Sequence, residues 1–324
     1  MKQLPEFARH ERTVICWPSR QSLYGKFMGE AERAHAALAR TISAFEPVTM
    51  IANSEHVDRA ENMCGEGVEV VSLPIDDSWF RDTGPIYVLD DSGKRVAGCW
   101  TFNGWGNKYS PYDCDVDVAA AWAKLAGHPI RKIDMVLEGG SINVDGSGYL
   151  VTTEQCLLNP DRNPEMTRQE IAQRLCTEIG VDEVIWLPHG LSLDNDTDGH
   201  VDNVAAFIAP RTVVLQRCDD ENEEDFDRLA RNRAVIDQFD LNVCEIPILP
   251  VIEFGGRRIQ VPYLNFYFCN GALIVPTCGH QADTDMLALL GEFIPDTEII
   301  GLDIGGILGY GGGGIHCVTQ QIPA

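Results

Sequence analysis

Four short polar segments of this sequence carry the side chains whose types suit covalent chemistry. Together they hold one thiol, one imidazole and four carboxylates, which belong to Cys317, His200, Asp82, Glu138, Asp198 and Asp202. A thiol can attack an electrophilic carbon, an imidazole can transfer protons, and carboxylates can hold a cation. A guanidinium fits this set, because its carbon is flanked by nitrogens and its planar fork of donors matches carboxylates bidentately. The set indicates covalent catalysis, with Cys317 as nucleophile and His200 as acid and base.

A metal site is the alternative interpretation of the same residues. His200 and Asp202, together with other acids, could ligate zinc or manganese. However, no second histidine has the spacing of a ligand, because His316 is adjacent to Cys317 and neighbouring strand residues point to opposite faces. We therefore expect no metal and no other cofactor.

Each of these residues can also have a purely structural role. Asp82 can cap a turn, Glu138 can accept hydrogen bonds from the glycines that follow it, and Asp202 can brace His200. Cys317 can be an inert buried thiol, as we expect for most of the eleven cysteines. Catalysis is favoured because the four segments occupy the same position within a unit of secondary structure that repeats along the chain.

The elements that would position these segments repeat along the chain, roughly every 50 to 65 residues. Helices are predicted over 30–45, 116–127, 167–180, 225–239 and 282–293, and single strands over 47–53, 68–75, 130–137, 181–188, 242–249 and 297–304. Hairpins are predicted over 84–102, 142–153, 201–218 and 257–277, and residues 314–321 begin a fifth unit that the strand over 13–17 and the helix after it could complete.

Five units of helix, strand and hairpin predict an α/β fold, a five-bladed α/β propeller formed by one domain over 1–324. An ordinary mixed sheet is the alternative, since hairpins occur there too. Each polar segment lies between the single strand of a unit and its hairpin. In a ring of equivalent units these segments would meet at one end of the axis.

The composition limits the compartment and the partners. Asp and Glu outnumber Lys and Arg by 49 to 25, which gives a net charge of −24 and a field that repels nucleic acid and anionic membranes while attracting cations. An acidic surface can also serve solubility alone. No CxxC pair, export-signal run or membrane-spanning stretch is present in the sequence, so we expect a cytoplasmic protein with free thiols. The sequence leaves the oligomeric state open, and a homo-oligomer is compatible with it.

The glycine run before Cys317, in GGGGIHCVTQQ, has none of the lysine and hydroxyl residues of a phosphate-binding loop. Glycine suits a backbone that bends sharply and approaches a ligand closely. We therefore expect this run to deliver the first residues of a strand, Cys317 among them, to the mouth of the propeller.

Taken together, these motifs make the sequence similar to the family of agmatine deiminases and bacterial peptidylarginine deiminases. These guanidine-modifying enzymes share a five-bladed α/β propeller, the pentein fold. The similarity covers nearly the whole chain, through the stretches ERTVICWP, WFRDTGP, FNGWGNKY, EGGS, LLNPDRNP, LPHG, TDGHVDN, LNFYFCNG and GIHCVTQQ.

The resemblance implies roles for individual residues. The nucleophile of the family falls on Cys317, and its acid and base on His200. The carboxylates that bind the guanidinium fall on Asp82 and Asp202. Glu138 matches a glutamate that holds the substrate and supports the histidine.

The resemblance also implies a cofactor-free reaction. The thiol forms a covalent thiouronium intermediate, ammonia leaves, and water then releases a ureido product. With agmatine the product is N-carbamoylputrescine, a precursor of putrescine in polyamine biosynthesis. Trp79 corresponds to an aromatic residue beside the substrate, and a tryptophan of the core is its structural alternative.

Departures from the family pattern concern the substrate. Gly314 stands where agmatine deiminases usually have the asparagine of GGGNIHC, and Asp196 stands where they commonly have the glutamate of DETDGH, which can face a distal amine. We assign Asp196, Asp198 and Gly314 to substrate binding. The alternatives are a deiminase of peptidylarginine or free arginine, an amidinotransferase, and a non-catalytic propeller that binds cations.

Overall fold

The computed structural model describes residues 1–248 and 251–324. Contacts divide the chain into two compact units, each described below by itself. The first unit comprises Met1–Pro5, Pro85–Ser110 and Ala123–Ile248, and the second comprises Glu6–Gly84, Pro111–Trp122 and 251–324. The single domain over 1–324 stays a prediction.

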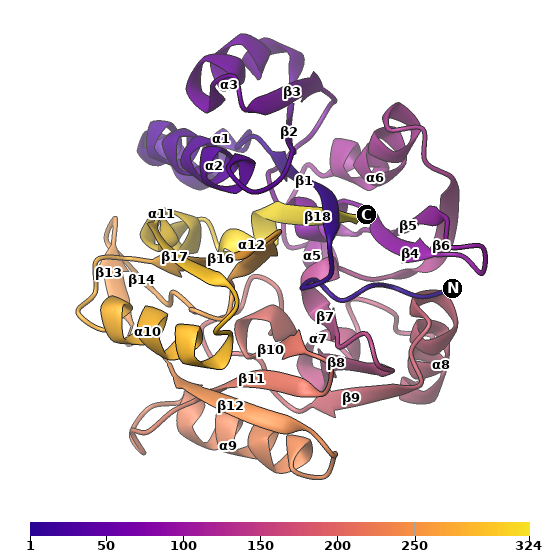
Figure 1. The fold of residues 1–324 in the computed structure, drawn as a ribbon, viewed down its shortest axis with the longest axis vertical. Helices are drawn as coiled ribbons and strands as arrows, with labels where there is room; N and C mark the ends of the chain where they lie inside the picture. The colour runs from indigo at the N-terminus through magenta and orange to yellow at the C-terminus, as the bar shows by residue number, and fades with distance from the viewer. Residues whose placement is uncertain (249–250) are drawn as a thin grey trace. The chain divides into compact units, whose positions relative to one another are not determined.

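The first unit contains three small sheets of the same construction. Each has an antiparallel hairpin and a third strand parallel to the second, in the orders β4-β5-β6, β7-β8-β9 and β10-β11-β12. The strands are β4 Ile86–Leu89, β5 Arg95–Thr101, β6 Ile130–Val136, β7 Ile142–Val144, β8 Tyr149–Thr153, β9 Glu183–Leu187, β10 Ala205–Ala209, β11 Thr212–Arg217 and β12 Asn242–Pro247. Figure 1 shows α9 lying along this last sheet.

The helices of the first unit either precede the parallel strands or lie in the loops. They are α5 Gly104–Asn107, η3 Gly139–Ser141, α7 Glu154–Leu157, α8 Arg168–Ile179, η4 Val201–Asn203 and α9 Asp225–Ile236. One further helix, α6 Asp113–Leu125, belongs in part to each unit.

The second unit repeats the sheet construction twice. Its sheets have the orders β15-β16-β17 and β18-β1-β2-β3, and β13 and β14 form a separate ribbon. The strands are β1 His10–Cys16, β2 Val48–Ala52, β3 Val68–Ser72, β13 Ile252–Phe254, β14 Arg257–Ile259, β15 Tyr267–Cys269, β16 Ala272–Thr277, β17 Glu298–Asp303 and β18 Thr319–Pro323. The helices are α1 Gln21–Tyr24, η1 Gly25–Phe27, α2 Met28–Ser43, η2 Ser54–His56, α3 Val57–Cys64, α4 Phe80–Thr83, α10 Asp283–Phe293, α11 Gly305–Tyr310 and α12 Ile315–Val318.

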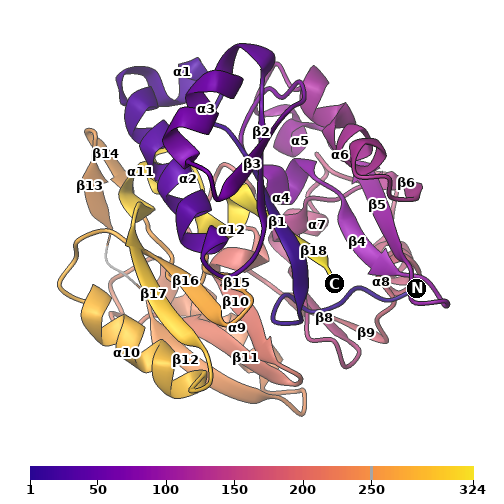
Figure 2. The same ribbon diagram turned by 45° about the horizontal axis from the view of Figure 1, so that its top comes forward.

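Strand β1 completes the sheet that β18 begins, as the sequence predicts. The two strands are antiparallel, with Val14 opposite Gln320, and β2 then pairs parallel to β1 (Figure 2). The α/β class and the five repeated sheets are therefore present among the described residues.

The grouping of the predicted elements into units differs from the sheets of the structure. The sequence pattern assigns the helix over 225–239 and the strand over 242–249 to the hairpin that follows them. In the structure β12 pairs with the preceding hairpin, where Thr212 lies opposite Asn242. The order within a sheet is thus hairpin, helix, strand, because a helical crossover returns the chain parallel to the strand it has just left. Residue 249 of the predicted strand lies outside the described residues.

Local sequence signals account for the ends of α8. Thr167 and Glu170 form a reciprocal capping box at its N-terminus, and Gly180 ends it in the left-handed conformation, with φ of +79°. The buried face of this helix joins an apolar core that includes Ile171, Leu175 and the strand residue Leu150. Packing and capping therefore act together on this element.

All eleven cysteines are free thiols, as predicted. Within 1–248 and 251–324, no helix combines the length and the apolar character needed to cross a membrane.

Candidate active site

The first unit brings two of the predicted segments together. Glu138 directly precedes η3 and His200 directly precedes η4, and these two short helices are in contact. Glu138 and His200 are both buried. The expectation that linkers between successive sheets converge is therefore confirmed within this unit.

Asp194 organises the loop that ends at His200. Its carboxylate accepts hydrogen bonds from the backbone N–H of Thr197 at 3.1 Å, the backbone N–H of His200 at 3.0 Å and the amide of Asn203 at 3.1 Å. Burial raises the pKa of Asp194. The same carboxylate thus fixes the backbone before His200 and at His200 itself, and it holds the side chain of Asn203 after it, a role that sequence reasoning did not assign.

Arg162 binds two of the candidate carboxylates of this unit, those of Glu138 and Asp198. Its buried guanidinium donates from Nε to Glu138 Oε1 at 2.6 Å, from Nη1 to Asp198 Oδ2 at 2.9 Å and from Nη2 to the Thr197 carbonyl at 3.1 Å. Lys108 Nζ lies 2.6 Å from Asp198 Oδ1. Asp198, assigned above to substrate binding, is therefore held by two cations of the protein.

Arg162 binds only one of the two carboxylate oxygens of Glu138. Glu138 is fully buried, and its Oε2 atom has no hydrogen-bond partner among the described residues. Burial raises the pKa of this carboxyl, while the charge of Arg162 opposes the shift. The arginine thus fixes the orientation of Glu138 and leaves Oε2 able to accept a further group.

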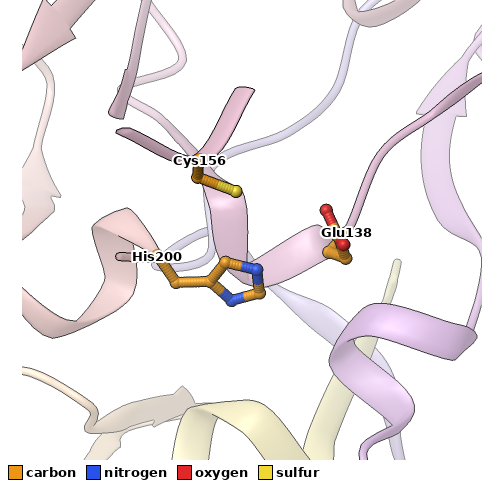
Figure 3. Close-up of side chains that lie close together, drawn as sticks. All are labelled: Glu138, Cys156 and His200. Atoms are coloured by element: carbon orange, nitrogen blue, oxygen red, sulfur yellow. The ribbon is translucent and has the colours of Figure 1, made fainter. Parts of the chain in front are cut away.

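Cys156 is the third side chain at this place. Its Sγ atom, a carboxylate oxygen of Glu138 and a ring nitrogen of His200 all lie within 4.8 Å of one another. The three side chains face one another, with Cys156 coming from α7 (Figure 3). Sequence reasoning missed both Cys156 and Arg162, although both lie in the stretch CLLNPDR, most of which carries the family resemblance.

Asp196 and Asp202 lie on either side of His200 in the chain and differ in exposure. Asp202 is buried within η4, whereas Asp196 is partly exposed. The hydroxyl of Tyr109 donates to the Asp196 carboxylate. Both remain predicted substrate ligands.

The second unit contains the candidate nucleophile. The predicted strand over 314–321 is wrong in its first half, because Cys317 lies in the helical turn α12 and β18 begins only at Thr319. Hydrogen bonds from the Thr319 hydroxyl to the Ile315 and His316 carbonyls, at 3.0 and 3.1 Å, close this turn. Cys317 is 5 % exposed.

Asn265 contacts the thiol directly. Its Nδ2 atom donates to Cys317 Sγ at 3.2 Å, and its Oδ1 atom accepts from the backbone N–H of His316 at 3.0 Å. A donor at this distance stabilises negative charge on sulfur. Sequence reasoning missed Asn265, although it belongs to the quoted stretch LNFYFCNG.

The glycine run allows the close approach that the sequence predicts, but the atoms approached are those of side chains. A Cβ atom at Gly314 would lie 2.3 Å from Asn265 Oδ1, and one at Gly313 would lie 2.5 Å from the indole of Trp79. Gly314, assigned to substrate binding, therefore makes room for Asn265. Trp79 and Asp82 are both buried. Trp79 precedes α4 and Asp82 lies within it, and α4 contacts α12.

A buried ion network fixes α4 and α12 to each other. Arg81 donates to Glu6 Oε2 at 2.8 Å and to the His316 carbonyl at 3.2 Å, and His316 Nε2 lies 2.9 Å from the same Glu6 oxygen. Burial opposes ionisation of Glu6, but the charges of His316 and Arg81 outweigh it and lower its pKa to about 2. Asp82 and Cys317 each adjoin a member of this network in the chain.

The alternative interpretation of these residues as a metal site has part of its ligand set in the structure, His200 with an acid, but not Asp202. The group of side chains that could hold an ion among the described residues combines Glu138, Cys156 and His200 and does not include Asp202.

Comparisons with known proteins extend over the whole chain. The model of the Porphyromonas-type peptidyl-arginine deiminase family matches residues 2–323. The agmatine deiminase of Stutzerimonas stutzeri is 38% identical, over 98% of this chain and 94% of the relative, and a putative agmatine deiminase of Legionella pneumophila is 36% identical, over 98% and 93%. The solved structure of agmatine deiminase from Enterococcus faecalis superimposes with a TM-score of 0.94 at 30% identity, covering 99% of this chain and 95% of that one.

Proposed function

Because the chain belongs to the Porphyromonas-type peptidyl-arginine deiminase family, we propose that it hydrolyses agmatine to N-carbamoylputrescine and ammonia. One observation carries the choice of agmatine: relatives named as agmatine deiminases match it at 36% and 38% identity over 98% of its length. The enzyme is a hydrolase that acts on carbon–nitrogen bonds of a guanidine.

The reaction begins with the thiol. Cys317 Sγ, as thiolate, attacks the guanidinium carbon, and His200 gives a proton to the departing amino group, which leaves as ammonia. His200 then takes a proton from water, whose oxygen attacks the carbon of the thiouronium. The carbon–sulfur bond then breaks and the thiolate is restored. The remaining hydroxyl proton passes to solvent, where it protonates the released ammonia, and the product carries a ureido group.

Contacts within each unit support these roles. Asn265 Nδ2, 3.2 Å from Cys317 Sγ, stabilises the thiolate both before attack and when it leaves. Glu138, held by Arg162, keeps Oε2 available to accept from an N–H group of the guanidinium or from the ring of His200. We assign Asp82 and Asp202 to the remaining N–H groups of the guanidinium.

The distal end of the substrate selects among guanidines. Agmatine ends in an ammonium group, and we assign Asp196, whose carboxylate Tyr109 orients, to this charge. Trp79 packs along the substrate as an aromatic neighbour, and Gly314 acts through the position of Asn265. Asp198 acts through Arg162 and Lys108, because both of its oxygens are paired with them.

We further place the protein in the cytoplasm, without a cofactor, acting on a small cationic guanidino substrate and not on nucleic acid or membranes. Its net charge of −24 favours such a substrate over polyanions. A homo-oligomer and a role in polyamine biosynthesis are part of the same proposal.

Substrate choice and reaction class are tested by one assay. Agmatine, arginine, methylated arginines and an arginine peptide are incubated with the enzyme, and ammonia and ureido product are measured without an amine acceptor. We expect agmatine to give the highest kcat/KM. Higher activity on the peptide or on arginine would overturn the substrate assignment. Turnover of agmatine that requires an added amine acceptor and yields putrescine in place of ammonia would indicate an amidinotransferase.

The covalent step is tested by Cys317→Ser. We expect ammonia release to fall at least about 10⁴-fold, since the hydroxyl is a far weaker nucleophile, while agmatine binding measured by calorimetry is retained. Substitution of the buried Cys64 by serine is the matched control. Activity that survives in the Cys317 variant contradicts the mechanism, and a wild-type protein that binds agmatine without releasing ammonia indicates a non-catalytic protein that binds cations.

A further inference from the structure

Cys156 has no role in the proposed reaction, yet it is buried beside two groups that do. Its Sγ atom lies within 4.8 Å of the nearest ligand atoms of Glu138 and His200, and the thiol is fully buried. The three residues come from α7, from the residue before η3 and from the residue before η4. Three separate segments thus present a thiol, a carboxylate and an imidazole to one point (Figure 3).

The donor set is one that zinc accepts. Zn²⁺ binds thiolate sulfur at about 2.3 Å and imidazole nitrogen at about 2.0 Å, so two such ligands lie about 3.5 Å apart in a tetrahedron. The three ligand atoms of this cluster lie within 4.8 Å of one another, so each pair would have to approach by at most about 1.3 Å to reach that spacing. Three protein ligands leave the fourth position open to water, as in other zinc sites with three protein ligands.

Glu138 supplies an independent indication of a missing ligand. Arg162 occupies its Oε1 atom, whereas Oε2 is buried without a hydrogen-bond partner among the described residues. A buried carboxylate oxygen in this state carries an unmet requirement for a cation or a donor. The guanidinium of Arg162 also fixes the plane of the carboxylate, as outer-shell partners of metal ligands do.

We propose that Glu138, Cys156 and His200 form a binding site for a thiophilic divalent cation of the Zn²⁺ class, and that the bound cation inhibits the enzyme by occupying the ring nitrogen of His200. Binding replaces the Cys156 S–H bond with a sulfur–metal bond and releases that proton to solvent. Glu138 Oε2 and His200 each donate a lone pair. The effect on catalysis rests on the proposed function, but the binding itself does not.

Binding is tested with Co²⁺, a spectroscopic substitute for Zn²⁺, on the full chain carrying Cys317→Ser, so that the candidate nucleophile cannot act as the ligand. We expect a thiolate-to-cobalt charge-transfer band that Zn²⁺ removes. Adding Cys156→Ser should abolish the band, whereas adding Cys64→Ser, at another buried cysteine, should leave it unchanged. A band that persists without Cys156, or that never forms, overturns the proposal.

Glu138→Gln provides a second readout that preserves the size of the side chain. In the Cys317→Ser background it should weaken Co²⁺ binding about tenfold or more, because an amide oxygen is a poorer ligand than a carboxylate. This variant decides the matter if Cys156→Ser does not fold, which circular dichroism and thermal unfolding report. Unchanged Co²⁺ affinity overturns the proposal.

Inhibition is measured in the chain with Cys317 intact, and each variant is compared with its own rate in a chelator. Zn²⁺ should inhibit the wild type, and Cys156→Ser should need at least about tenfold more Zn²⁺ for the same fractional loss. Equal sensitivity of the two would show that inhibition occurs elsewhere. If agmatine is not hydrolysed at all, the proposed function fails while the cobalt experiment still decides the metal site.

Discussion

The two units of the molecule each bury an arginine among polar groups, but the two arginines hold different kinds of group. Arg162 in the first unit donates directly to Glu138, a residue proposed to act on the substrate. Arg81 in the second unit donates to Glu6 and to the backbone of His316, neither of which has a proposed role in the chemistry. A buried guanidinium can thus orient a functional carboxylate or brace the scaffold around a nucleophile.

The carboxylates held by these arginines differ in the same way. Burial raises the pKa of Glu138 despite Arg162, whereas in Glu6 the charges of His316 and Arg81 overcome burial and the pKa falls to about 2. Glu6 is bound by Arg81 and His316, whereas Glu138 has one oxygen without a hydrogen-bond partner among the described residues. Incomplete pairing is the cost of keeping a group ready for a ligand.

Replacement of each arginine by lysine, which cannot reproduce the planar set of donors, distinguishes the two roles most strongly. Arg162→Lys should lower kcat/KM for agmatine about 100-fold or more, because Glu138 loses its orientation. Arg81→Lys should lower it less than about tenfold. Steady-state ammonia release measures both, below the melting temperature of each variant. Equal losses of activity would remove the distinction between the two arginines.

The free energy of unfolding is expected to depend on pH in opposite directions through Glu6 in the second unit and Glu138 in the first. The pKa of Glu6 is lowered, so its contribution to folding is complete above pH 4.5 and is lost as the pH falls towards 2; the shift corresponds to about 3 kcal/mol. Glu6→Gln should therefore flatten the acid side of the stability profile, measured by urea unfolding.

The pKa of Glu138 is shifted in the direction opposite to that of Glu6, so Glu138→Gln is the control for Glu6→Gln. The pKa of Glu138 is raised, so the folded protein binds the proton more tightly than the unfolded chain, and stability is lost as the pH rises through the raised value. Glu138→Gln should remove the loss of stability that occurs as the pH rises. It should leave unchanged the steep loss of stability at acid pH. Profiles of the two variants that shift in the same direction would contradict the proposed difference in pairing.

The smallest expected effect tests the close approach beside the nucleophile. Gly314→Ala places a Cβ atom 2.3 Å from Asn265 Oδ1, so we expect a loss of about 1–3 kcal/mol in the free energy of unfolding. The loss should shrink in an Asn265→Ala background. Gly29→Ala is the matched control, because its Cβ would make only ordinary contacts, with the side chains of Arg33 at 3.6 Å and Glu32 at 3.9 Å. A cost at Gly314 that is independent of Asn265 would refute this explanation.

Local signals in the sequence predicted much of the fold. The Thr167 cap, the glycine at 180 and the alternation of apolar residues locate elements well, because these signals act over a few residues. The prediction grouped each helix and single strand with the hairpin that follows, whereas the structure pairs the strand with the hairpin that precedes it. The direction of the crossover selects the strand partners, and the local sequence pattern does not show it. The turn at Cys317 was missed because its hydrogen bonds depend on Thr319 and on packing.

For the candidate site, the sequence likewise predicted some residues and missed others. Residue types and the family resemblance pointed to Glu138, His200 and Cys317, and their catalytic roles stay predictions. Arg162 and Asn265 escaped residue-by-residue reasoning, because an arginine or an asparagine in a loop is usually a surface residue, and their importance comes from partners 24 and 52 positions away in the chain. Only the three-dimensional structure brings such partners into view.

The pairing of β1 with β18 has a consequence for how the chain acquires its structure. Val14 finds its partner at Gln320, so this ladder closes a loop that spans almost the whole sequence. Contacts of such sequence separation are slow to form. During synthesis β1 can pair with β2 early, while its other edge waits for β18 to leave the ribosome. An exposed edge strand is a template for wrong pairing, so β1 is open to mispairing until β18 has been made.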